Sequence, residues 1–326
     1  MVRLLVLQTK HAMREWSRDR KDNCGGRRTL ALVPTMGSLH AGHLALVKKA
    51  GEVADDIVVS IYVNPAQFAP TEDFGTYPRS LEKDLELLEG FPKVQSVFAP
   101  TNLYDDRPSP QTMAQTMASA TNSNGSAKKG QQPMTSTSAA EVEDEDDDEG
   151  SGDAVAESMA TGHQSWVTVS RLQTPLCGVS RPHFFRGVAT VVAKLFHIVS
   201  PDVAVFGEKD YQQLRVIETM VRELDFGVNI VRAPIVREAD GLAMSSRNAL
   251  LSDDARLRAR CISASLKHAQ HLVVGRGEFR ADVLKQCVVS AVAEAGGEID
   301  YVAVVDAETL QDREDVASTR CIIAAA

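Results

Sequence analysis

The sequence predicts an α/β protein, with a Rossmann-like parallel sheet followed by a smaller α+β domain. Short apolar runs recur at 30–33, 57–63 and 203–206, and the second is rich in β-branched residues, as in strands that a parallel sheet buries on both faces. Each run is followed by a polar turn and then by a helical pattern. Near the C-terminus, two helical patterns precede two short strand patterns. We therefore expect one domain over 1–236 and a second over 237–326.

The same criteria place the remaining elements in order. Ser80 is a suitable N-cap for a helix over 81–88, and Pro201 ends the helix whose apolar residues run from Val188 to Val199. The first apolar run belongs to a strand over 29–34, and further strands are expected at 3–7, 96–100, 166–169, 229–236, 299–306 and 321–324. Further helices are expected at 8–21, at 40–51, after the third apolar run up to residue 224, and at 253–274 and 278–295.

Length and composition fit a globular protein. The chain has 326 residues, enough for two domains, and its hydrophobic content of 44% is ordinary. The net charge is −9, but twelve acidic and three basic residues lie between 101 and 165, so that segment carries the whole excess. The remainder is neutral, which argues against nucleic-acid binding. No membrane span or targeting segment is recognised, so we expect a cytoplasmic protein.

Segment 104–163 differs in character from the rest. No Ile, Leu, Phe, Tyr or Trp occurs from Asp105 to His163, and an acidic run occupies 141–149. Such a composition cannot bury enough apolar surface to offset the entropy lost on ordering. We interpret it as a disordered insertion in a surface loop, and a regulatory or partner-binding tail is the less favoured alternative.

The five cysteines are scattered, and none forms a Cys-x-x-Cys pair. An odd number at wide spacing indicates neither a disulfide framework nor a zinc site. A reducing compartment is the simpler expectation.

The stretch 34–43, Pro-Thr-Met-Gly-Ser-Leu-His-Ala-Gly-His, joins a predicted strand to a predicted helix, where open α/β sheets bind ligands. Gly37 lets the backbone approach a ligand. His40 and His43 share a face at the helix N-terminus, which attracts phosphate. Two imidazoles there can donate hydrogen bonds to a triphosphate. The alternative is one packed and one surface histidine, but the spacing on a strand–turn–helix favours a functional pair.

Two further strand-to-helix turns carry polar side chains. Asn64 and Gln67 follow the second apolar run and offer amide groups to a small polar ligand, although an Asn-Pro pair is also ordinary turn chemistry. After the third run, Lys209 suits a phosphate charge and Gln213 lies one turn into the helix. On the helix over 81–88, Asp84 could reach a magnesium ion if that helix points at the phosphates.

Residues 237–248 form the last block. Ser245 and Ser246 stand beside Arg247 after an Asp-Gly turn, which fits a mobile phosphate clamp. The alternative is a domain-boundary loop before a capped helix, because Ser-Asp-Asp at 252–254 is itself a helix start signal. The other polar turns favour the clamp.

Together these blocks resemble one family, the pantoate–β-alanine ligases or pantothenate synthetases. The resemblance lies in Pro34-Thr35-Met36-Gly37 with His40-x-Gly-His43, in Val63-Asn64-Pro65-x-Gln67-Phe68, in Phe-Gly-Glu-Lys-Asp-Tyr-Gln-Gln at 206–213 and in Asp-Gly-Leu-Ala-Met-Ser-Ser-Arg-Asn at 240–248. It covers nearly the whole chain outside 104–163. His-x-Gly-His alone is shared by a wider nucleotidyltransferase superfamily, whereas all four blocks in this order are highly specific.

The resemblance implies a Rossmann-like domain, a C-terminal lid, a homodimer and the ATP-dependent ligation of pantoate with β-alanine (EC 6.3.2.1). Pantoate would attack the α-phosphorus of ATP to give pantoyl adenylate and pyrophosphate. The amine of β-alanine would then attack the adenylate to give pantothenate, a coenzyme A precursor, and AMP. Mg²⁺ would be held mainly through the ATP phosphates, because it keeps its waters and uses few protein ligands.

The resemblance also implies residue roles. The catalytic group would be His40, His43, Lys209, Ser245, Ser246 and Arg247, with His43 stabilising the adenylation transition state. ATP would be bound by Met36, Gly37, His40, His43, Gly207, Lys209, Asp210, Val236, Met244, Ser245, Ser246 and Arg247. Pantoate would be held by Pro34, Met36, Asn64, Gln67 and Gln213. Phe184 stands where many members have a histidine, so no pantoate contact is assigned there, and His183 is not taken as its substitute.

Two other functions compete with the ligase. Another His-x-Gly-His adenylyltransferase would need a second phosphate site in place of the Asn64, Gln67 and Gln213 set. A non-catalytic nucleotide-binding regulator would be expected to have lost part of the cationic constellation, which is complete here. The ligase is therefore the favoured function.

Overall fold

The computed structural model describes residues 4–23, 25, 28–69, 72–104 and 163–326. The described residues within 1–103 and 165–326 form one compact unit. The disordered insertion expected over 104–163 falls on residues 105–162, which lie outside the described residues. Among the described residues, no helix is long and apolar enough to cross a membrane.

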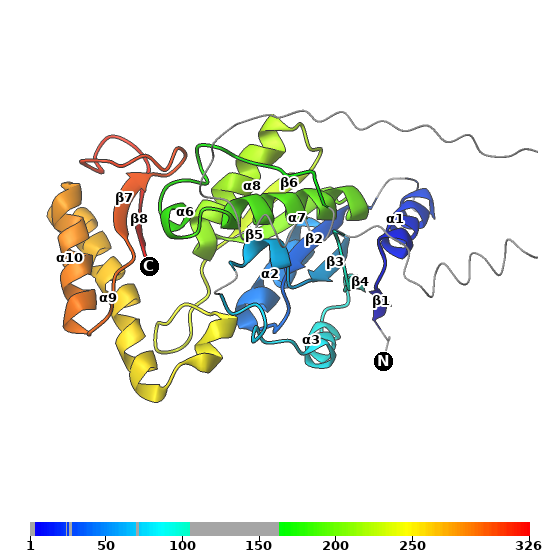
Figure 1. Cartoon of the computed structure of the whole chain (residues 1–326), viewed down its shortest axis with the longest axis horizontal. Helices are drawn as coiled ribbons and strands as arrows, with labels where there is room; N and C mark the ends of the chain where they lie inside the picture. The colour runs from blue at the N-terminus through cyan, green and yellow to red at the C-terminus, as the bar shows by residue number, and fades with distance from the viewer. Residues whose placement is uncertain (1–3, 24, 26–27, 70–71, 105–162) are drawn as a thin grey trace, which may run out of the picture. The chain divides into compact units, whose positions relative to one another are not determined.

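The main sheet has six strands, all parallel (Figure 1). In spatial order they are β1 (Leu5–Leu7), β4 (Val94–Phe98), β3 (Asp56–Ile61), β2 (Leu30–Thr35), β5 (Val203–Gly207) and β6 (Asn229–Ala233). The central strands are buried along nearly their whole length, which explains their continuous apolar runs. The predicted α/β fold class is confirmed.

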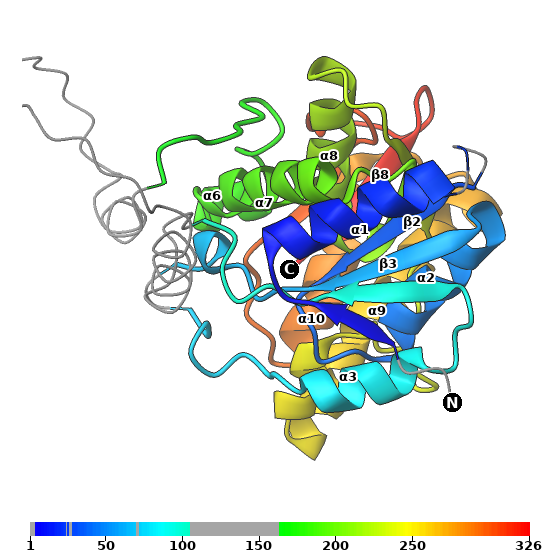
Figure 2. The ribbon, with the colours of Figure 1, turned by 90° about the vertical axis from the view of Figure 1, so that its right-hand side faces the viewer.

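Helices cover both faces of this sheet (Figure 2). One face carries α1 (Lys10–Asn23), α7 (Phe184–Val199) and α8 (Tyr211–Glu223), and the other carries α2 (Ala41–Val53) and α3 (Leu81–Leu88). On the α2 and α3 face, Val33 and Val59 from the strands pack with Val47 and Leu88 from the helices. Alternate strand residues therefore fill two separate helix–sheet interfaces.

The order of the strands also locates the ligand crevice. β2 pairs with β3 on one side and with β5 on the other, so the chain reverses its direction of travel across the sheet between β2 and β5. Ligands of open parallel sheets bind beyond the carboxyl ends of the strands at such a switch point. The turns that follow β2, β3 and β5 all open toward this edge.

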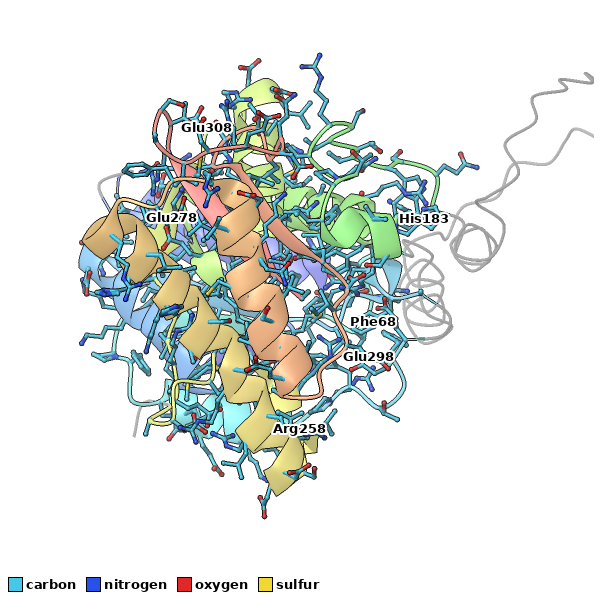
Figure 3. All side chains as sticks on the ribbon, turned by 90° about the vertical axis from the view of Figure 1, so that its left-hand side faces the viewer. Phe68, His183, Arg258, Glu278, Glu298 and Glu308 are labelled. Atoms are coloured by element: carbon cyan, nitrogen blue, oxygen red, sulfur yellow. The ribbon has the colours of Figure 1, made fainter. Side chains whose placement is uncertain are left out.

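The C-terminal part contains α9 (Asp253–Arg276), α10 (Ala281–Glu294) and an antiparallel pair, β7 (Val302–Asp306) and β8 (Cys321–Ala325). The two helices pack side by side, with α10 against β7 (Figure 3). Their own core includes Ala269, Leu284, Val288 and Val304. This separate core suits a domain over 237–326, although the described parts of 1–236 and 237–326 belong to one compact unit, and the boundary remains a prediction.

Several expected strand bounds differ from the structure; β7, for instance, begins at Val302 rather than at 299. Residues 166–169 form no strand, because the backbone N–H of Val167 donates to Oγ1 of Thr190 at 3.0 Å and Arg186 lies over the Trp166 ring. Contacts with side chains of α7 thus take the place of hydrogen bonds to a neighbouring strand. The strand expected over 229–236 ends at Ala233, since Pro234 has no N–H to continue the ladder.

Candidate active site

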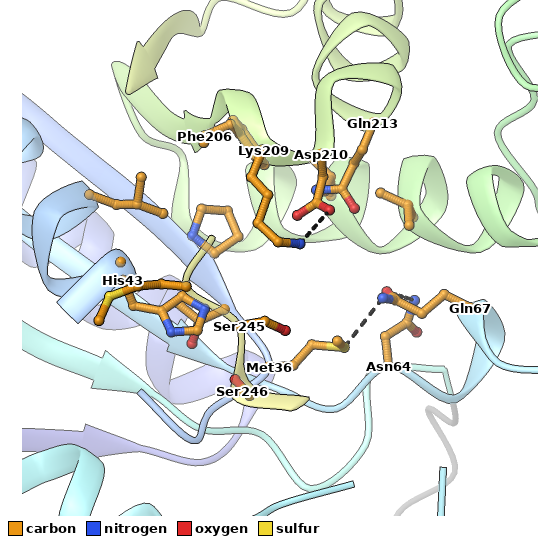
Figure 4. Close-up of a pocket in the computed structure, with 18 of the residues that line it drawn as sticks. Met36, His43, Asn64, Gln67, Phe206, Lys209, Asp210, Gln213, Ser245 and Ser246 are labelled. Atoms are coloured by element: carbon orange, nitrogen blue, oxygen red, sulfur yellow. Dashed lines mark hydrogen bonds and ion pairs between the residues drawn. The ribbon is translucent and has the colours of Figure 1, made fainter. Parts of the chain in front are cut away.

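A pocket of about 290 Å³ opens at the carboxyl ends of β2, β3 and β5 (Figure 4). It brings together the predicted site residues Pro34, Met36, His40, His43, Asn64, Gln67, Gly207, Lys209, Asp210, Gln213, Val236, Met244, Ser245, Ser246 and Arg247. Gly37 and Asp84 are not among its lining residues. Figure 4 shows Lys209 and Gln213 on one wall, with Met36 and Gln67 on the facing wall.

Asp84 anchors the turn between β2 and α2. Its carboxylate accepts the backbone N–H groups of Ser38 and Leu39 at 2.9 and 2.7 Å, and the side chain is almost fully buried. Gly37 fits between Asp84 and Ile61 with a positive φ of 87°, where a Cβ would lie 3.1 and 3.0 Å from those side chains. Asp84 therefore has an anchoring role, and its contact with magnesium remains a prediction.

His40 and His43 form the N-terminal cap of α2. Nδ1 of His40 accepts the backbone N–H of Gly42 at 3.1 Å, and Nδ1 of His43 accepts the backbone N–H of His40 at 3.4 Å. The two rings stack with their centroids 4.0 Å apart. Because both Nδ1 atoms accept hydrogen bonds, the network assigns the hydrogen of each neutral ring to Nε2.

Both imidazoles are neutral at physiological pH. Burial is the main reason that the pKa of His43 falls to about 3, and repulsion from His40 lowers it further. Burial also lowers the pKa of His40, with Lys209 acting in the same direction. The pair therefore offers two uncharged N–H donors, and preorganised donors of this kind can stabilise a developing charge.

The amide side chains that line the pocket follow β3 in the chain and contact α7. Nδ2 of Asn64 donates to Oε1 of Gln67 at 3.0 Å and to the carbonyl of Gly187 at 3.1 Å, and Nε2 of Gln67 lies 3.3 Å from Sδ of Met36. Gly187 permits this contact, because a Cβ there would lie 2.0 Å from the carbonyl oxygen of Ala66. Asn64 thus orients Gln67 as well as lining the pocket.

Adjacent glutamines on α8 have different surroundings. Gln212 is buried, where its side chain donates to the carbonyl of Leu172 at 2.9 Å and accepts the N–H of Cys177 at 3.1 Å. Gln213 lines the pocket instead. At the turn before them, within the short helix η2 (Glu208–Asp210), Nζ of Lys209 lies 3.1 Å from the carboxylate of Asp210.

The predicted phosphate clamp, residues 245–247, contacts the turn between β2 and α2. In η3 (Ser246–Leu250), Oγ of Ser246 donates to the carbonyl of Ser38 at 3.1 Å. Residues 236–244 form a hairpin, and Nδ2 of Asn248 closes it by donating to Oε1 of Glu238 at 2.7 Å and to the carbonyl of Ala243 at 2.9 Å. The hairpin therefore extends from the C-terminal part to the pocket rather than serving only as a boundary loop.

Sequence reasoning missed several lining residues. Cζ of Arg181 lies 3.8 Å from the centroid of the Phe184 ring. Both residues line the pocket, as do Tyr62 and Tyr77. One wall comes from the apolar stripe of α7, which the sequence assigned only to the core: Val188, Val191, Val192 and Leu195. The sequence did signal Phe184, which stands where many family members have a histidine. No local sequence pattern, by contrast, marks Tyr77 as a pocket residue.

The family model for pantoate-beta-alanine ligase matches residues 5–326. The chain belongs to this family. A pantoate–β-alanine ligase of Arabidopsis thaliana is 44% identical over 322 residues, which cover 98% of this chain and 93% of the relative. The family assignment favours the ligase over the adenylyltransferase and the non-catalytic regulator.

Solved structures of pantoate–β-alanine ligases share the fold. The pantothenate synthetase of Thermus thermophilus matches with a TM-score of 0.75 and 34% identity, covering 99% of this chain and 95% of that one. The ligase of Francisella tularensis, solved in complex with beta-gamma ATP and β-alanine, matches with a TM-score of 0.64 and 24% identity over 98% and 96% of the two chains.

Proposed function

We propose that this pocket makes pantothenate from pantoate, β-alanine and ATP through a bound pantoyl adenylate. The carboxylate of pantoate attacks the α-phosphorus of ATP, and pyrophosphate leaves. The amine of β-alanine then attacks the acyl carbon, loses a proton and displaces AMP. The observation that carries the proposal is the joining, in one pocket, of a cationic and N–H-donating end with an amide-lined end.

The donating end suits the triphosphate. His40 and His43 present neutral N–H groups at the N-terminus of α2, and Lys209 and Arg247 add positive charge. We assign His43 to the charge that develops at the α-phosphate and Lys209 to the phosphates. These groups need no covalent chemistry, because positioning and charge stabilisation lower the barrier.

The remaining ATP contacts follow the same arrangement. We assign the ribose to Asp210, and the closing contacts on the triphosphate to Ser245, Ser246 and Arg247. Supporting contacts to ATP are assigned to Met36, Gly37, Gly207, Val236 and Met244, of which all but Gly37 line the pocket.

The amide end suits a small hydroxy acid. Gln67 and Gln213 stand on facing walls, where amide groups can pair with the hydroxyls and carboxylate of pantoate (Figure 4). Met36 and Pro34 supply apolar contact beside them. Asn64 acts mainly through Gln67, to which it donates a hydrogen bond.

Mg²⁺ would join the site through the ATP phosphates. Among the residues that the structure describes, no group of three or more histidine, cysteine or acidic side chains could hold a metal ion alone. Mg²⁺ keeps several of its waters and commonly binds through substrate phosphates with few protein ligands. When bound, the ion would neutralise phosphate charge.

The broader assignments are also proposals. We propose that residues 237–326 act as a lid domain, that the enzyme is a cytoplasmic homodimer, and that it acts on small molecules without binding nucleic acid or membranes. The contact between Ser246 and Ser38 supports the lid, because it connects the C-terminal part to the phosphate-binding turn. Analytical ultracentrifugation tests the homodimer, and localisation of a tagged chain tests the cytoplasmic location.

The deciding experiment is pantoate-dependent exchange of labelled pyrophosphate into ATP without β-alanine. The wild type should exchange only when pantoate is present, and His43→Ala should lose most of this activity. His268→Ala, an exposed histidine on α9, is the matched control and should behave like the wild type. AMP release on addition of β-alanine completes the assignment. Absence of exchange despite ATP binding would contradict it.

A further inference from the structure

Two adjacent acids, Glu72 and Asp73, each hold an arginine of a different element. Asp73 accepts from Arg247, with Oδ2 2.9 Å from Nε and Oδ1 2.9 Å from Nη2. Glu72 accepts from Arg181, with Oε1 2.7 Å from Nε and Oε2 2.6 Å from Nη2. Both pairs are bidentate, the geometry that fixes a guanidinium most firmly. We call Glu72 and Asp73 the acidic pair.

Both arginines line the pocket, but beside different neighbours. Arg247 follows the serines of the predicted phosphate clamp and lies 5.6 Å from the Tyr77 ring centroid. Arg181 also donates to the carbonyl of Gln67 at 3.3 Å, next to the amide-lined end. A guanidinium has five N–H donors, and each acid engages two nitrogens through one edge of the fork. Further donors on each arginine thus remain for a substrate.

The chain that carries the acidic pair is held by local contacts. Phe68 makes edge-to-face contacts with Phe74 and Tyr77, at centroid distances of 5.3 and 5.9 Å. The backbone N–H of Thr76 donates to the carbonyl of Asp73 at 3.1 Å. These contacts hold the backbone beside the acidic pair, and the bidentate hydrogen bonds from the two arginines orient the carboxylates. Asp73 is ionised at neutral pH, because Arg247 lowers its pKa.

We propose that Glu72 and Asp73 are positioning residues that serve different substrates: Asp73 orients Arg247 toward the ATP phosphates, and Glu72 orients Arg181 toward the pantoate end. This inference rests on the proposed function. The physical gain is entropic, since a free arginine has many rotamers, and a pre-oriented fork loses less freedom when it binds an anion.

The test is a crossed pair of variants, Asp73→Asn and Glu72→Gln, which remove one negative charge each with little change in shape. Asp73→Asn should raise the KM and Kd for ATP about tenfold, the effect of losing one charge-assisted hydrogen bond, and leave the KM for pantoate unchanged. Glu72→Gln should raise the KM for pantoate about tenfold, for the same reason, and leave the KM and Kd for ATP unchanged. The control is Glu82→Gln, an exposed acid on α3, which should change neither constant.

Three measurements separate the outcomes. ATP titration calorimetry without pantoate gives the Kd, steady-state kinetics give both KM values, and thermal unfolding checks the fold. A merely structural role would move both KM values together and lower the unfolding temperature, which would overturn the inference. Variants indistinguishable from Glu82→Gln would also overturn it. If the wild type itself shows no pantoate-dependent pyrophosphate exchange, the proposed function fails instead.

Discussion

The backbone N–H of His40 donates to Nδ1 of His43 at 3.4 Å, and this bond fixes the tautomer of the second ring. With Nδ1 engaged, the hydrogen of the neutral imidazole sits on Nε2. The peptide group of one histidine thus orients the other. His43 is a permanent, uncharged donor rather than an acid that must be protonated.

This tautomer leads to a pH prediction. His43 has a pKa of about 3, so it stays neutral over the whole range from pH 5 to 8. We expect His43→Gln, which keeps an N–H donor that cannot titrate, to slow pyrophosphate exchange by up to about 10²–10³-fold through poorer geometry. The ratio of the wild-type rate to the variant rate should be constant from pH 5 to 8, because ionisation of the substrates changes both rates by the same factor. A rate ratio that changes around pH 6.5 would show that His43 titrates with an ordinary histidine pKa and would contradict the prediction.

Gly42→Ala should damage the cap that holds the histidines. An added Cβ would lie 2.8 Å from Cε1 and 2.9 Å from Nδ1 of His40, so the ring must turn away. We expect the exchange rate to fall at least tenfold, as for loss of a charge-stabilising contact. The matched control is Gly51→Ala on the same helix, where the nearest atoms are 3.7 and 3.8 Å away and alanine should stabilise the helix by up to about 1 kcal/mol. Equal rates for the two variants would contradict the prediction.

The sequence was informative wherever a structural requirement is local. The apolar runs of β2, β3 and β5 predict buried parallel strands, and the polar residues that follow them predict the edge where the pocket opens. Helix α3 begins and ends at the expected residues. These features depend on periodicity and on neighbours along the chain, both of which can be read directly.

Contacts between distant residues could not be read in this way. The roles of Asp84 and Arg181 depend on backbone and side-chain groups 45 and 109 positions away. The segment 166–169 has strand-like residues but faces α7, so tertiary contacts override its propensity. Likewise, the stripe of α7 is apolar whether it meets the core or a ligand, and composition alone cannot separate the two.

Asp84→Asn should separate anchoring from metal binding. In asparagine an NH2 group replaces one carboxylate oxygen, so the N–H of either Ser38 or Leu39 faces a donor and is left unsatisfied, at a cost of about 1–3 kcal/mol in the free energy of unfolding. If anchoring is the role, exchange slows but the Mg²⁺ concentration for half-maximal rate does not change. A large increase in that concentration would instead make Asp84 a metal ligand. Glu86→Gln, on the exposed side of α3, is the control.

Gly187→Ala should weaken the pantoate end selectively. Its Cβ would overlap the backbone of the neighbouring short helix η1 (Pro65–Gln67), at 2.0 Å from the carbonyl oxygen of Ala66 and 2.8 Å from the nitrogen of Gln67. Backbone atoms cannot rotate away, so α7 and η1 must separate, which costs about 1–3 kcal/mol in the free energy of unfolding.

The same separation would carry away the Gly187 carbonyl that accepts from Asn64, and so release Gln67. We therefore expect Gly187→Ala to raise the KM for pantoate more than the KM for ATP, and to lower the unfolding temperature. Gly227→Ala, where no atom lies within 4 Å of the added Cβ, should change neither. If both KM values rose equally, Asn64 would not be acting through Gln67 on one substrate, because the His40 and His43 end shares none of these bonds.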